Sequence, residues 1–253
     1  MLMGDAAAFR AMHVPGSPVV LPNAWDAWSA RMVARAGFPA VASSSAAVAR
    51  SLGSEDGEVM SVDLALDAAR RMCVAVPDVP VTIDFEGGYG LPGSEIAARL
   101  LDVGAAGCNL EDTDRRTKGE LLPLDDVVAR IAAVRAAAGD RLVINARVDS
   151  FIRGRPDARR ESIERGRAYL DAGADCVYPI TASDEGDLAA MVEALGVVNV
   201  YLSPATPSLS RLAELGVARV SVGGGLFEVM TSQVGAVLTR LHDDGDDSVF
   251  REG

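Results

Sequence analysis

Lysine and histidine are almost missing from this sequence. Lys118 is the single lysine among 24 basic residues, and the two histidines, His13 and His242, lie near opposite ends of the chain. Schiff-base enzymes need a desolvated lysine, whereas Lys118 stands in a polar stretch, which disfavours imine chemistry. Histidines so far apart also disfavour a histidine-based zinc site and a Ser-His-Asp triad. The chemistry is therefore expected to come mainly from carboxylates, arginine, hydroxyl groups and a hard metal ion.

Cysteine, surplus positive charge and long apolar runs are scarce as well. Cys73, Cys108 and Cys176 show no CxxC spacing, so we expect reduced, buried thiols. A formal charge of -12 and a pI near 4.6 argue against a nucleic-acid partner, which needs clustered basic residues. The sequence shows neither a secretory leader pattern nor an apolar run of membrane-spanning length, so we expect a cytoplasmic protein without a membrane partner.

What the sequence does contain is a regular alternation of short apolar runs with segments of helical periodicity. We expect eight strands, at residues 18–24, 40–45, 79–86, 106–112, 141–149, 176–181, 199–204 and 218–224. Several helical segments between them end in glycine, the residue that best adopts the left-handed conformation of a helix C-terminus. Eight β-then-α units in 253 residues predict an α/β fold, a single (β/α)8 TIM barrel over residues 1–253, with a loosely ordered tail at 242–253.

Acidic side chains stand at the ends of several expected strands. Asp84 and Glu86 end the third strand and, two residues apart, are expected to share a face. Glu111 ends the fourth strand, Arg147 the fifth, and Asp56 lies in the loop after the second. Because TIM barrels build their active sites at the carboxyl ends of the strands, we expect these side chains to converge on one mouth.

Several carboxylates in one place repel one another unless a cation lies among them. Oxygen ligands favour Mg²⁺, and Mn²⁺ is also possible. We therefore infer a Mg²⁺ site at the barrel mouth. The alternative is that these acids form plain ion pairs with Arg147, Arg115 and Arg116.

Four motifs now point to a known family: ASSSAAVARSLGSEDGE, DFEGGYG, CNLED and INARVDSF occur in this order. Together they resemble the isocitrate lyase and phosphoenolpyruvate mutase superfamily over residues 18–225. The resemblance implies a (β/α)8 barrel that binds Mg²⁺ and a 2-oxo acid or its enolate. It also implies a homo-oligomer, a dimer or tetramer, in which C-terminal helices are swapped between subunits.

The same resemblance assigns roles to the acidic residues of the expected mouth. Asp84 resembles the direct metal ligand of the superfamily. Three further carboxylates resemble the shell that holds metal-bound waters, namely Asp56, Glu86 and Glu111. Arg147, Glu111 and Asp56 are accordingly the residues expected to take part in catalysis.

The resemblance also implies a set of substrate contacts. Ser44 and Ser45 match the segment that grips the substrate carboxylate, and Arg147 matches the arginine that pairs with the oxo acid. Asn199 falls near a position that contacts substrate in some lyases. Trp25, at the exit of the first strand, either lines the mouth or packs against the first helix; with Asp84 it completes the expected substrate-binding set.

The loop at 112–123, DTDRRTKGELLP, lacks the K-x-C-G-H motif of the lyases, and Ile180 stands where a lyase glutamate is expected. Arg115, Arg116 and Lys118 of this loop form either a basic lid or a solvated stretch of mixed charge. A Mg²⁺-dependent enzyme that cleaves a carbon-carbon bond through an enolate fits the remaining residues, as an oxaloacetate decarboxylase or a substituted-malate lyase. A phosphonomutase acting on a P–C bond and a non-catalytic barrel that binds metal and 2-oxo acid are the alternatives.

Overall fold

The computed structural model of the chain describes residues 5–114 and 119–251, and within them the strands form a parallel barrel. The barrel strands are β1 (Val19–Leu21), β2 (Asn23–Ala24), β3 (Val41–Ser43), β4 (Val81–Asp84), β5 (Gly107–Glu111), β8 (Val143–Val148), β9 (Cys176–Pro179), β10 (Asn199–Tyr201) and β11 (Arg219–Ser221). Pro22, which has no N–H to donate, separates β1 from β2, so the two form one interrupted first strand. The eight expected strands are therefore confirmed.

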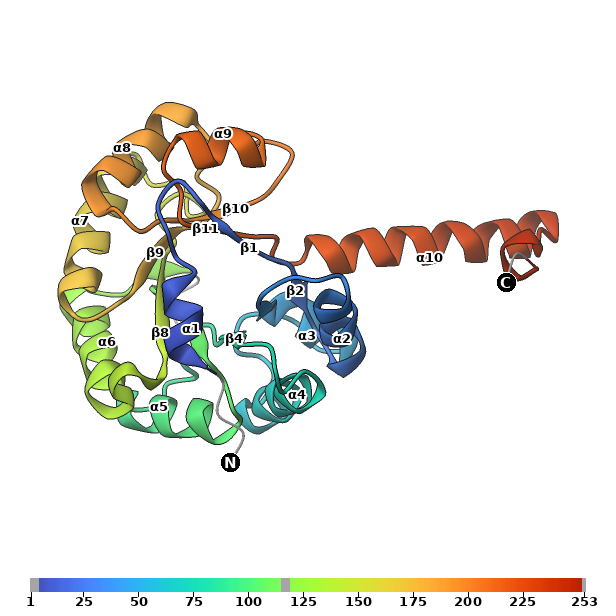
Figure 1. Cartoon of the computed structure of the whole chain (residues 1–253), viewed down its shortest axis with the longest axis horizontal. Helices are drawn as coiled ribbons and strands as arrows, with labels where there is room; N and C mark the ends of the chain where they lie inside the picture. The colour runs from blue at the N-terminus through green and yellow to red at the C-terminus, as the bar shows by residue number, and fades with distance from the viewer. Residues whose placement is uncertain (1–4, 115–118, 252–253) are drawn as a thin grey trace.

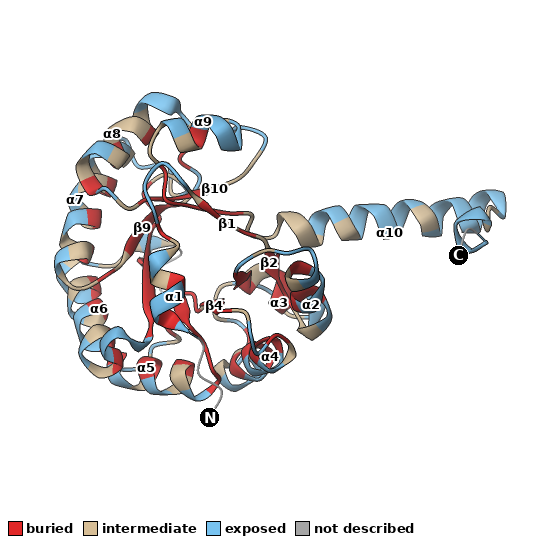
Figure 2. Ribbon diagram, viewed as in Figure 1, coloured by how far each residue is buried: buried red, intermediate tan, exposed pale blue. Residues whose placement is uncertain are grey.

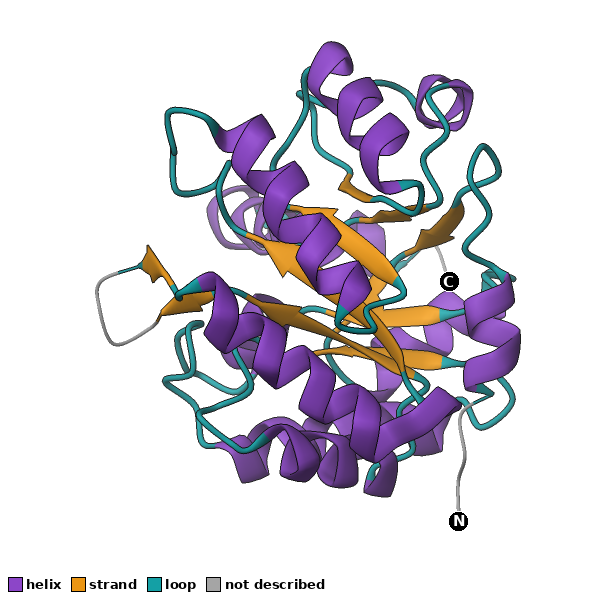
Figure 3. Cartoon of the chain, turned by 90° about the vertical axis from the view of Figure 1, so that its left-hand side faces the viewer, coloured by secondary structure: helices purple, strands orange, loops and turns teal. Residues whose placement is uncertain are grey.

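Strand pairing closes these elements into a ring. One parallel sheet has the order β2-β3-β4-β5-β8-β9, and a second has the order β1-β11-β10. A parallel bridge between Val177 and Val198 joins β9 to the segment that enters β10, and the interrupted first strand joins the two sheets on the other side. Figure 3 shows the strands side by side inside their layer of helices. The predicted TIM barrel is thereby confirmed.

The surrounding helices cover the barrel with their apolar faces. They are α2 (Ala27–Arg35), α3 (Ser45–Ser51), α4 (Val62–Ala75), α5 (Gly93–Asp102), α6 (Leu124–Ala138), α7 (Ala158–Asp171), α8 (Glu185–Leu195) and α9 (Leu209–Glu214). In α5, for example, Ile96, Ala97 and Leu100 are buried, at the three- and four-residue spacing of one helix face. Figure 2 shows the same division, with buried stripes toward the strands and exposed stripes outside.

The amino end of the barrel is closed by α1 (Ala6–Ala11). Phe9 of this helix is fully buried and packs with Val19, Leu21, Ala42 and Val143 at the bottom of the barrel. The opposite, carboxyl end of the strands carries the polar side chains. We therefore look for the functional site at the carboxyl end of the strands.

The last long helix, α10 (Gly225–Asp244), projects away from the barrel, as Figure 1 shows. None of its residues is buried. The tail expected to be loosely ordered from residue 242 instead begins inside this helix, and it continues into a 3-10 helix, η2 (Ser248–Phe250).

The remaining short elements are β6 (Thr113–Asp114), β7 (Glu120–Leu121) and η1 (Gly139–Arg141). No helix in the described ranges is both long and apolar enough to cross a bilayer.

Candidate active site

A pocket of about 230 Å³ opens at the carboxyl ends of the strands. It brings together residues that are far apart in the sequence and that follow different strands. The polar lining comes from the early strands and from β5, β8 and β11, and the apolar lining follows β8, β9 and β10. Its lining side chains include Asn23, Ser44, Ser45, Asp56, Asp84, Asn109, Arg147, Ile152, Tyr178, Ile180, Tyr201 and Ser221.

Asp84 is the last residue of β4, and its carboxylate is held from two sides. The backbone N–H and the hydroxyl of Ser45 lie 3.2 and 3.0 Å from Asp84 Oδ2, and both donate to it. Asn109 Nδ2 lies 3.4 Å from the other oxygen, Oδ1. Asn109 is itself oriented, because its Oδ1 accepts hydrogen bonds from Asn145 Nδ2 and Arg219 Nη2. Asp84 therefore presents a positioned carboxylate to the pocket.

Glu86 does not share the face of Asp84, contrary to the expectation from their spacing. The strand ends at Asp84, and Glu86 has a φ of 47°, in the left-handed region that breaks the alternation of a strand. Its side chain is buried and accepts hydrogen bonds from Glu58 N at 2.6 Å and Tyr89 Oη at 2.9 Å. Glu86 thus lies outside the pocket lining and connects the loop that carries Glu58 to the loop that carries Tyr89. Nothing in the local sequence spacing indicates this contact with Glu58.

Arg147, on β8, lies between two carboxylates. Its Nη1 is 2.8 Å from Glu111 Oε2, and its Nε is 2.6 Å from Asp149 Oδ1. The pairing with Glu111 follows from the register of β5 and β8, which sets the two residues side by side. Burial alone lowers the pKa of Arg147, but Glu111 and Asp149 outweigh it, and the pKa lies above its ordinary value. Arg147 is thus a permanently charged group at the pocket wall.

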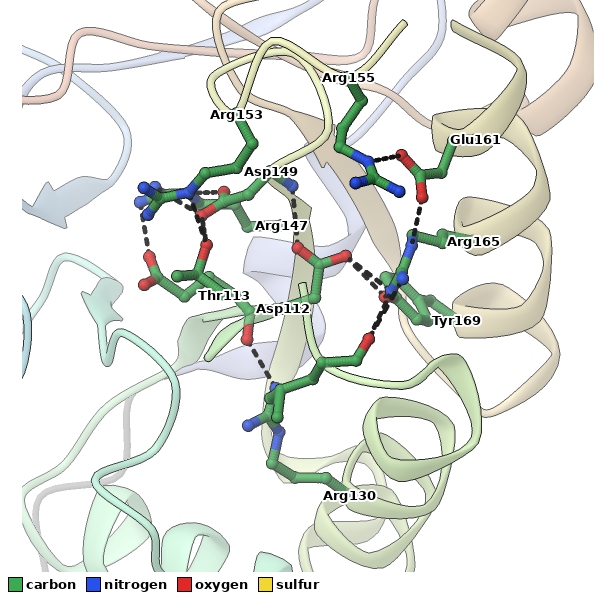
Figure 4. A network of polar contacts seen from close by, with 12 residues as sticks. Asp112, Thr113, Arg130, Arg147, Asp149, Arg153, Arg155, Glu161, Arg165 and Tyr169 are labelled. Atoms are coloured by element: carbon green, nitrogen blue, oxygen red, sulfur yellow. Dashed lines mark hydrogen bonds and ion pairs between the residues drawn. The ribbon is translucent and has the colours of Figure 1, made fainter. Parts of the chain in front are cut away.

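A buried polar network supports this pair from behind (Figure 4). Asp149 accepts a hydrogen bond from Thr113, and its backbone N–H donates to Asp112 Oδ1 at 2.9 Å. Asp112 Oδ2 accepts in turn from Tyr169 Oη at 2.8 Å and Arg165 Nη1 at 3.3 Å. Burial, reinforced by the charge of Asp149, raises the pKa of Asp112 to about 6. The network ties the ends of β5 and β8 together and fixes the position of Asp149.

The other expected substrate contacts are divided between the pocket and the core. Ser44, Ser45 and Asp56 line the pocket, and Ser44 Oγ also caps α3 by accepting from Ala47 N at 3.3 Å. Asn199 is fully buried beneath the pocket and donates to Ser221 Oγ at 3.2 Å, so it does not line the pocket. Trp25 packs edge-on against Phe227 of α10, with ring centroids 5.0 Å apart, and is a packing residue.

Three lining residues outside the expected site set stand out. Tyr178 of β9 lies beside Arg147 of β8 in the sheet. Burial raises the pKa of its phenol to about 12, so the hydroxyl is neutral. Ile180 and Tyr201 flank it on the same side of the pocket. Their positions at the ends of β9 and β10 are the signal that identifies them, since strand-end residues of a TIM barrel face the site.

The carboxylates of the pocket can be compared with the expected Mg²⁺ site. Across the described ranges, no three His, Cys, Asp or Glu side chains converge into a ready-made metal cage. Glu86 contacts Glu58 N and Tyr89, and Glu111 pairs with Arg147, which leaves Asp84 and Asp56 as the carboxylates that line the pocket. This donor set fits Mg²⁺, because Mg²⁺ commonly takes one or two carboxylates and keeps several waters. The basic residues Arg115, Arg116 and Lys118 lie outside the described residues.

Comparison with known proteins now identifies the family. A family model described as phosphoenolpyruvate phosphomutase matches residues 9–242. The chain belongs to this family. The expected isocitrate lyase and phosphoenolpyruvate mutase superfamily is confirmed. The expected enzyme class, a carbon-carbon lyase of this superfamily, is confirmed as well.

Two relatives and one solved structure show how similar this chain is to other proteins of the superfamily. The chain is 34% identical to an uncharacterized protein of Mycobacterium tuberculosis, across 85% of this chain and 81% of the relative. It is 32% identical to the probable 2-methylisocitrate lyase 1 of Corynebacterium glutamicum, across 94% and 81%. The structure of 2,3-dimethylmalate lyase superposes with a TM-score of 0.84 at 25% identity, across 97% of this chain and 90% of that one.

Proposed function

We propose that this protein is a Mg²⁺-dependent lyase that cleaves a carbon-carbon bond in a 2-oxo acid or its aldol-type adduct through an enolate. The observation that carries the proposal is the pairing, within one small pocket, of the positioned carboxylate of Asp84 with the permanently charged Arg147. A carboxylate that holds a divalent cation and an arginine that binds a carboxylate oxygen are the two requirements for binding a 2-oxo acid. The names of the relatives, which include lyases, support the reaction class.

The metal would be held by Asp84, and Asp56, the other carboxylate that lines the pocket, would contact metal-bound water. When bound, a divalent cation supplies a Lewis acid that stabilises negative charge on the oxygen of the keto group. Ser45 keeps Asp84 turned toward the pocket by donating two hydrogen bonds to one of its oxygens. Asn109 fixes the other oxygen.

Arg147 binds the carboxylate end of the substrate in this proposal. Asp149 accepts hydrogen bonds from Nε and Nη2, and Glu111 forms an ion pair at Nη1, so the guanidinium, which has five N–H donors, retains donors for a ligand oxygen. Ala46, in the first turn of α3, also lines the pocket. Asp56, in an exposed loop at the pocket, is the proposed proton acceptor.

The proposal extends to a cytoplasmic homo-oligomer. Apolar residues on α10 recur at Val229, Met230, Val234, Leu238 and Leu241, which forms a stripe along one side of the helix. Val229, Val234 and Leu238 are more than half exposed in the single chain, whereas Leu226, Phe227 and Met230, at the start of α10, pack against the barrel. A helix with such a stripe is stabilised by burying it, and a second copy of the chain supplies the surface.

Turnover of candidate substrates tests this function. Purified protein with Mg²⁺ is incubated with oxaloacetate, 2,3-dimethylmalate, methylisocitrate and phosphonopyruvate, and products are followed by proton NMR. We expect release of pyruvate or another oxo acid by cleavage of one of the carbon substrates, loss of that activity with EDTA, and its absence in the Asp84→Asn variant. Consumption of phosphonopyruvate alone would replace the lyase with a phosphonomutase, and metal-independent turnover would refute the role of Asp84.

A further inference from the structure

The pocket has two chemically different walls on opposite sides of the barrel. Going round the ring from the interrupted first strand, the order is β3, β4, β5, β8, β9, β10 and β11. In a ring of eight, β9 and β10 therefore lie across from β3 and β4. Ser45 and Asp84, which follow β3 and end β4, form the polar wall.

The wall formed at the carboxyl ends of β8, β9 and β10 is uncharged and built around two isoleucines. Its side chains are Ile152 and Ile180, with the rings of Tyr178 and Tyr201 and the small side chain of Thr181 beside them, and none of the five is a cation. Ile180 directly follows β9, and its backbone N–H donates to Val148 O at 3.2 Å. This hydrogen bond anchors the backbone of Ile180 to the end of the neighbouring strand β8, and its side chain lines the pocket from there.

The pocket carries an excess of negative charge even without this wall, because Asp84 and Asp56 also line it. Among the described residues that line the pocket, Arg147 is the one cation, and Glu111 and Asp149 both pair with it. A carboxylate placed against Ile152 and Ile180 would leave water without gaining a cationic partner. Burying an unpaired ionised carboxylate is costly, whereas burying an alkyl group there is favourable.

We propose that the β9–β10 wall receives a short alkyl substituent of the substrate and rejects a carboxylate at the same position, with Ile180 as the specificity-determining residue. The proposal rests on the proposed function, because it requires the oxo-acid end of the ligand to lie at Asp84 and Arg147. The pocket volume of about 230 Å³ is below the range of roughly 300–1,000 Å³ common for drug-sized ligands, which restricts the substituent to a few carbons. The preferred ligand therefore carries an alkyl group where oxaloacetate carries its second carboxylate.

Two ligands of nearly equal shape separate the alternatives. Oxaloacetate and 4-methyl-2-oxopentanoate share the 2-oxo acid end and differ in a carboxylate or an isopropyl group at the tail. We expect the wild-type protein with Mg²⁺ to bind the isopropyl ligand at least tenfold more tightly in calorimetric titrations, with pyruvate as the reference. The Ile180→Lys variant, which introduces a cation at the wall, should reverse this preference, and Ile180→Met should keep it.

Each contrary outcome has a separate meaning. If pyruvate binds in a Mg²⁺-dependent manner but the wild-type protein prefers oxaloacetate, the assignment of the wall is overturned while the proposed function stands. An unchanged preference in a folded Ile180→Lys variant also overturns the role of Ile180. If no 2-oxo acid binds in the presence of Mg²⁺, the proposed function fails and the inference fails with it.

Discussion

Asp149 illustrates how a residue that does not line the pocket can control one that does. It makes two hydrogen bonds to the guanidinium of Arg147, at 2.6 and 3.2 Å, and is itself fully buried. Charge-assisted hydrogen bonds of this kind fix geometry as well as charge. The precision with which Arg147 meets a ligand therefore depends on Asp149 and on the network behind it.

Substituting Asp149 by asparagine tests this dependence. The amide keeps the shape but removes the charge that holds Arg147, so we expect kcat/KM to fall about 10- to 100-fold, the equivalent of one or two charged hydrogen bonds. Asp157 is the matched control, because it pairs with Arg160 on the exposed surface and Asp157→Asn should leave kcat/KM unchanged. Equal activity of the wild-type and Asp149→Asn proteins would show that Arg147 does not need this support.

His13 provides a pH-dependent stability term far from the pocket. Burial, followed by the charge of Arg219, lowers its pKa to about 4 from an ordinary value of 6.5. Because the unfolded chain binds this proton more readily, the stabilising term is complete above pH 6.5 and is lost as the pH falls toward 4. Between pH 7.5 and 4.5 the wild-type protein should lose about 2 to 3 kcal/mol more than the His13→Asn variant.

Urea denaturation at the two pH values measures this difference. His242, which is exposed on α10, is the control, and His242→Asn should follow the wild-type protein at both pH values. Parallel losses of stability in the wild-type and His13→Asn proteins would contradict the burial of a neutral histidine.

Individual residues were predictable where a strand holds them. Asp84 and Arg147 end strands of the expected barrel, and both line the pocket. Asn199 also lies on a strand, but further from its carboxyl end, so it is buried below the pocket. The depth of a residue within the barrel depends on strand stagger, which one sequence does not reveal.

At the level of elements, the loop after β4 determines where Glu86 points. Glu86 and Tyr89 have φ values of 47° and 56°, and Gly88 and Gly90 have 92° and 67°. Strand periodicity failed for Glu86 because it assumes extended backbone, whereas this loop turns through successive left-handed residues. The glycine-rich motif indicates such a turn but not which side chain it redirects.

Gly88 and Gly90 form a matched pair for testing this loop. Both have positive φ, so alanine at either position should cost about 1 kcal/mol of backbone strain. A Cβ at Gly88 would also lie 2.5 Å from Ile96 Cδ1 in the core, whereas at Gly90 it would meet no atom within 4 Å. Thermal or urea denaturation should therefore show Gly88→Ala less stable than Gly90→Ala by a further 1–3 kcal/mol; equal stabilities would contradict the described packing.

The whole molecule combines a closed barrel with a projecting helix. The barrel could be predicted because each β-then-α unit repeats the same local pattern, and the eight units required closure. The course of α10 could not be predicted in the same way. Its apolar stripe indicates that the helix packs against another surface, but it does not indicate which surface.

Oligomerisation is the whole-molecule prediction. We expect the wild-type protein to elute as a dimer or tetramer in size-exclusion chromatography with light scattering. A double Val234→Glu and Leu238→Glu substitution, which places charges on the exposed apolar stripe, should yield monomers, whereas Gln233→Glu should not. A monomeric wild-type protein would contradict the proposed role of α10.

Exchange of the methyl protons of pyruvate in D₂O tests the central claim most directly, because it detects enolate formation without knowledge of the physiological substrate. With Mg²⁺, the wild-type protein should replace these protons by deuterium well above the buffer rate, as followed by proton NMR. EDTA, or the Asp84→Asn substitution, should return the exchange to the buffer rate. Exchange no faster than in buffer for the folded, Mg²⁺-loaded wild-type protein would contradict an enolate-forming site at Asp84 and Arg147.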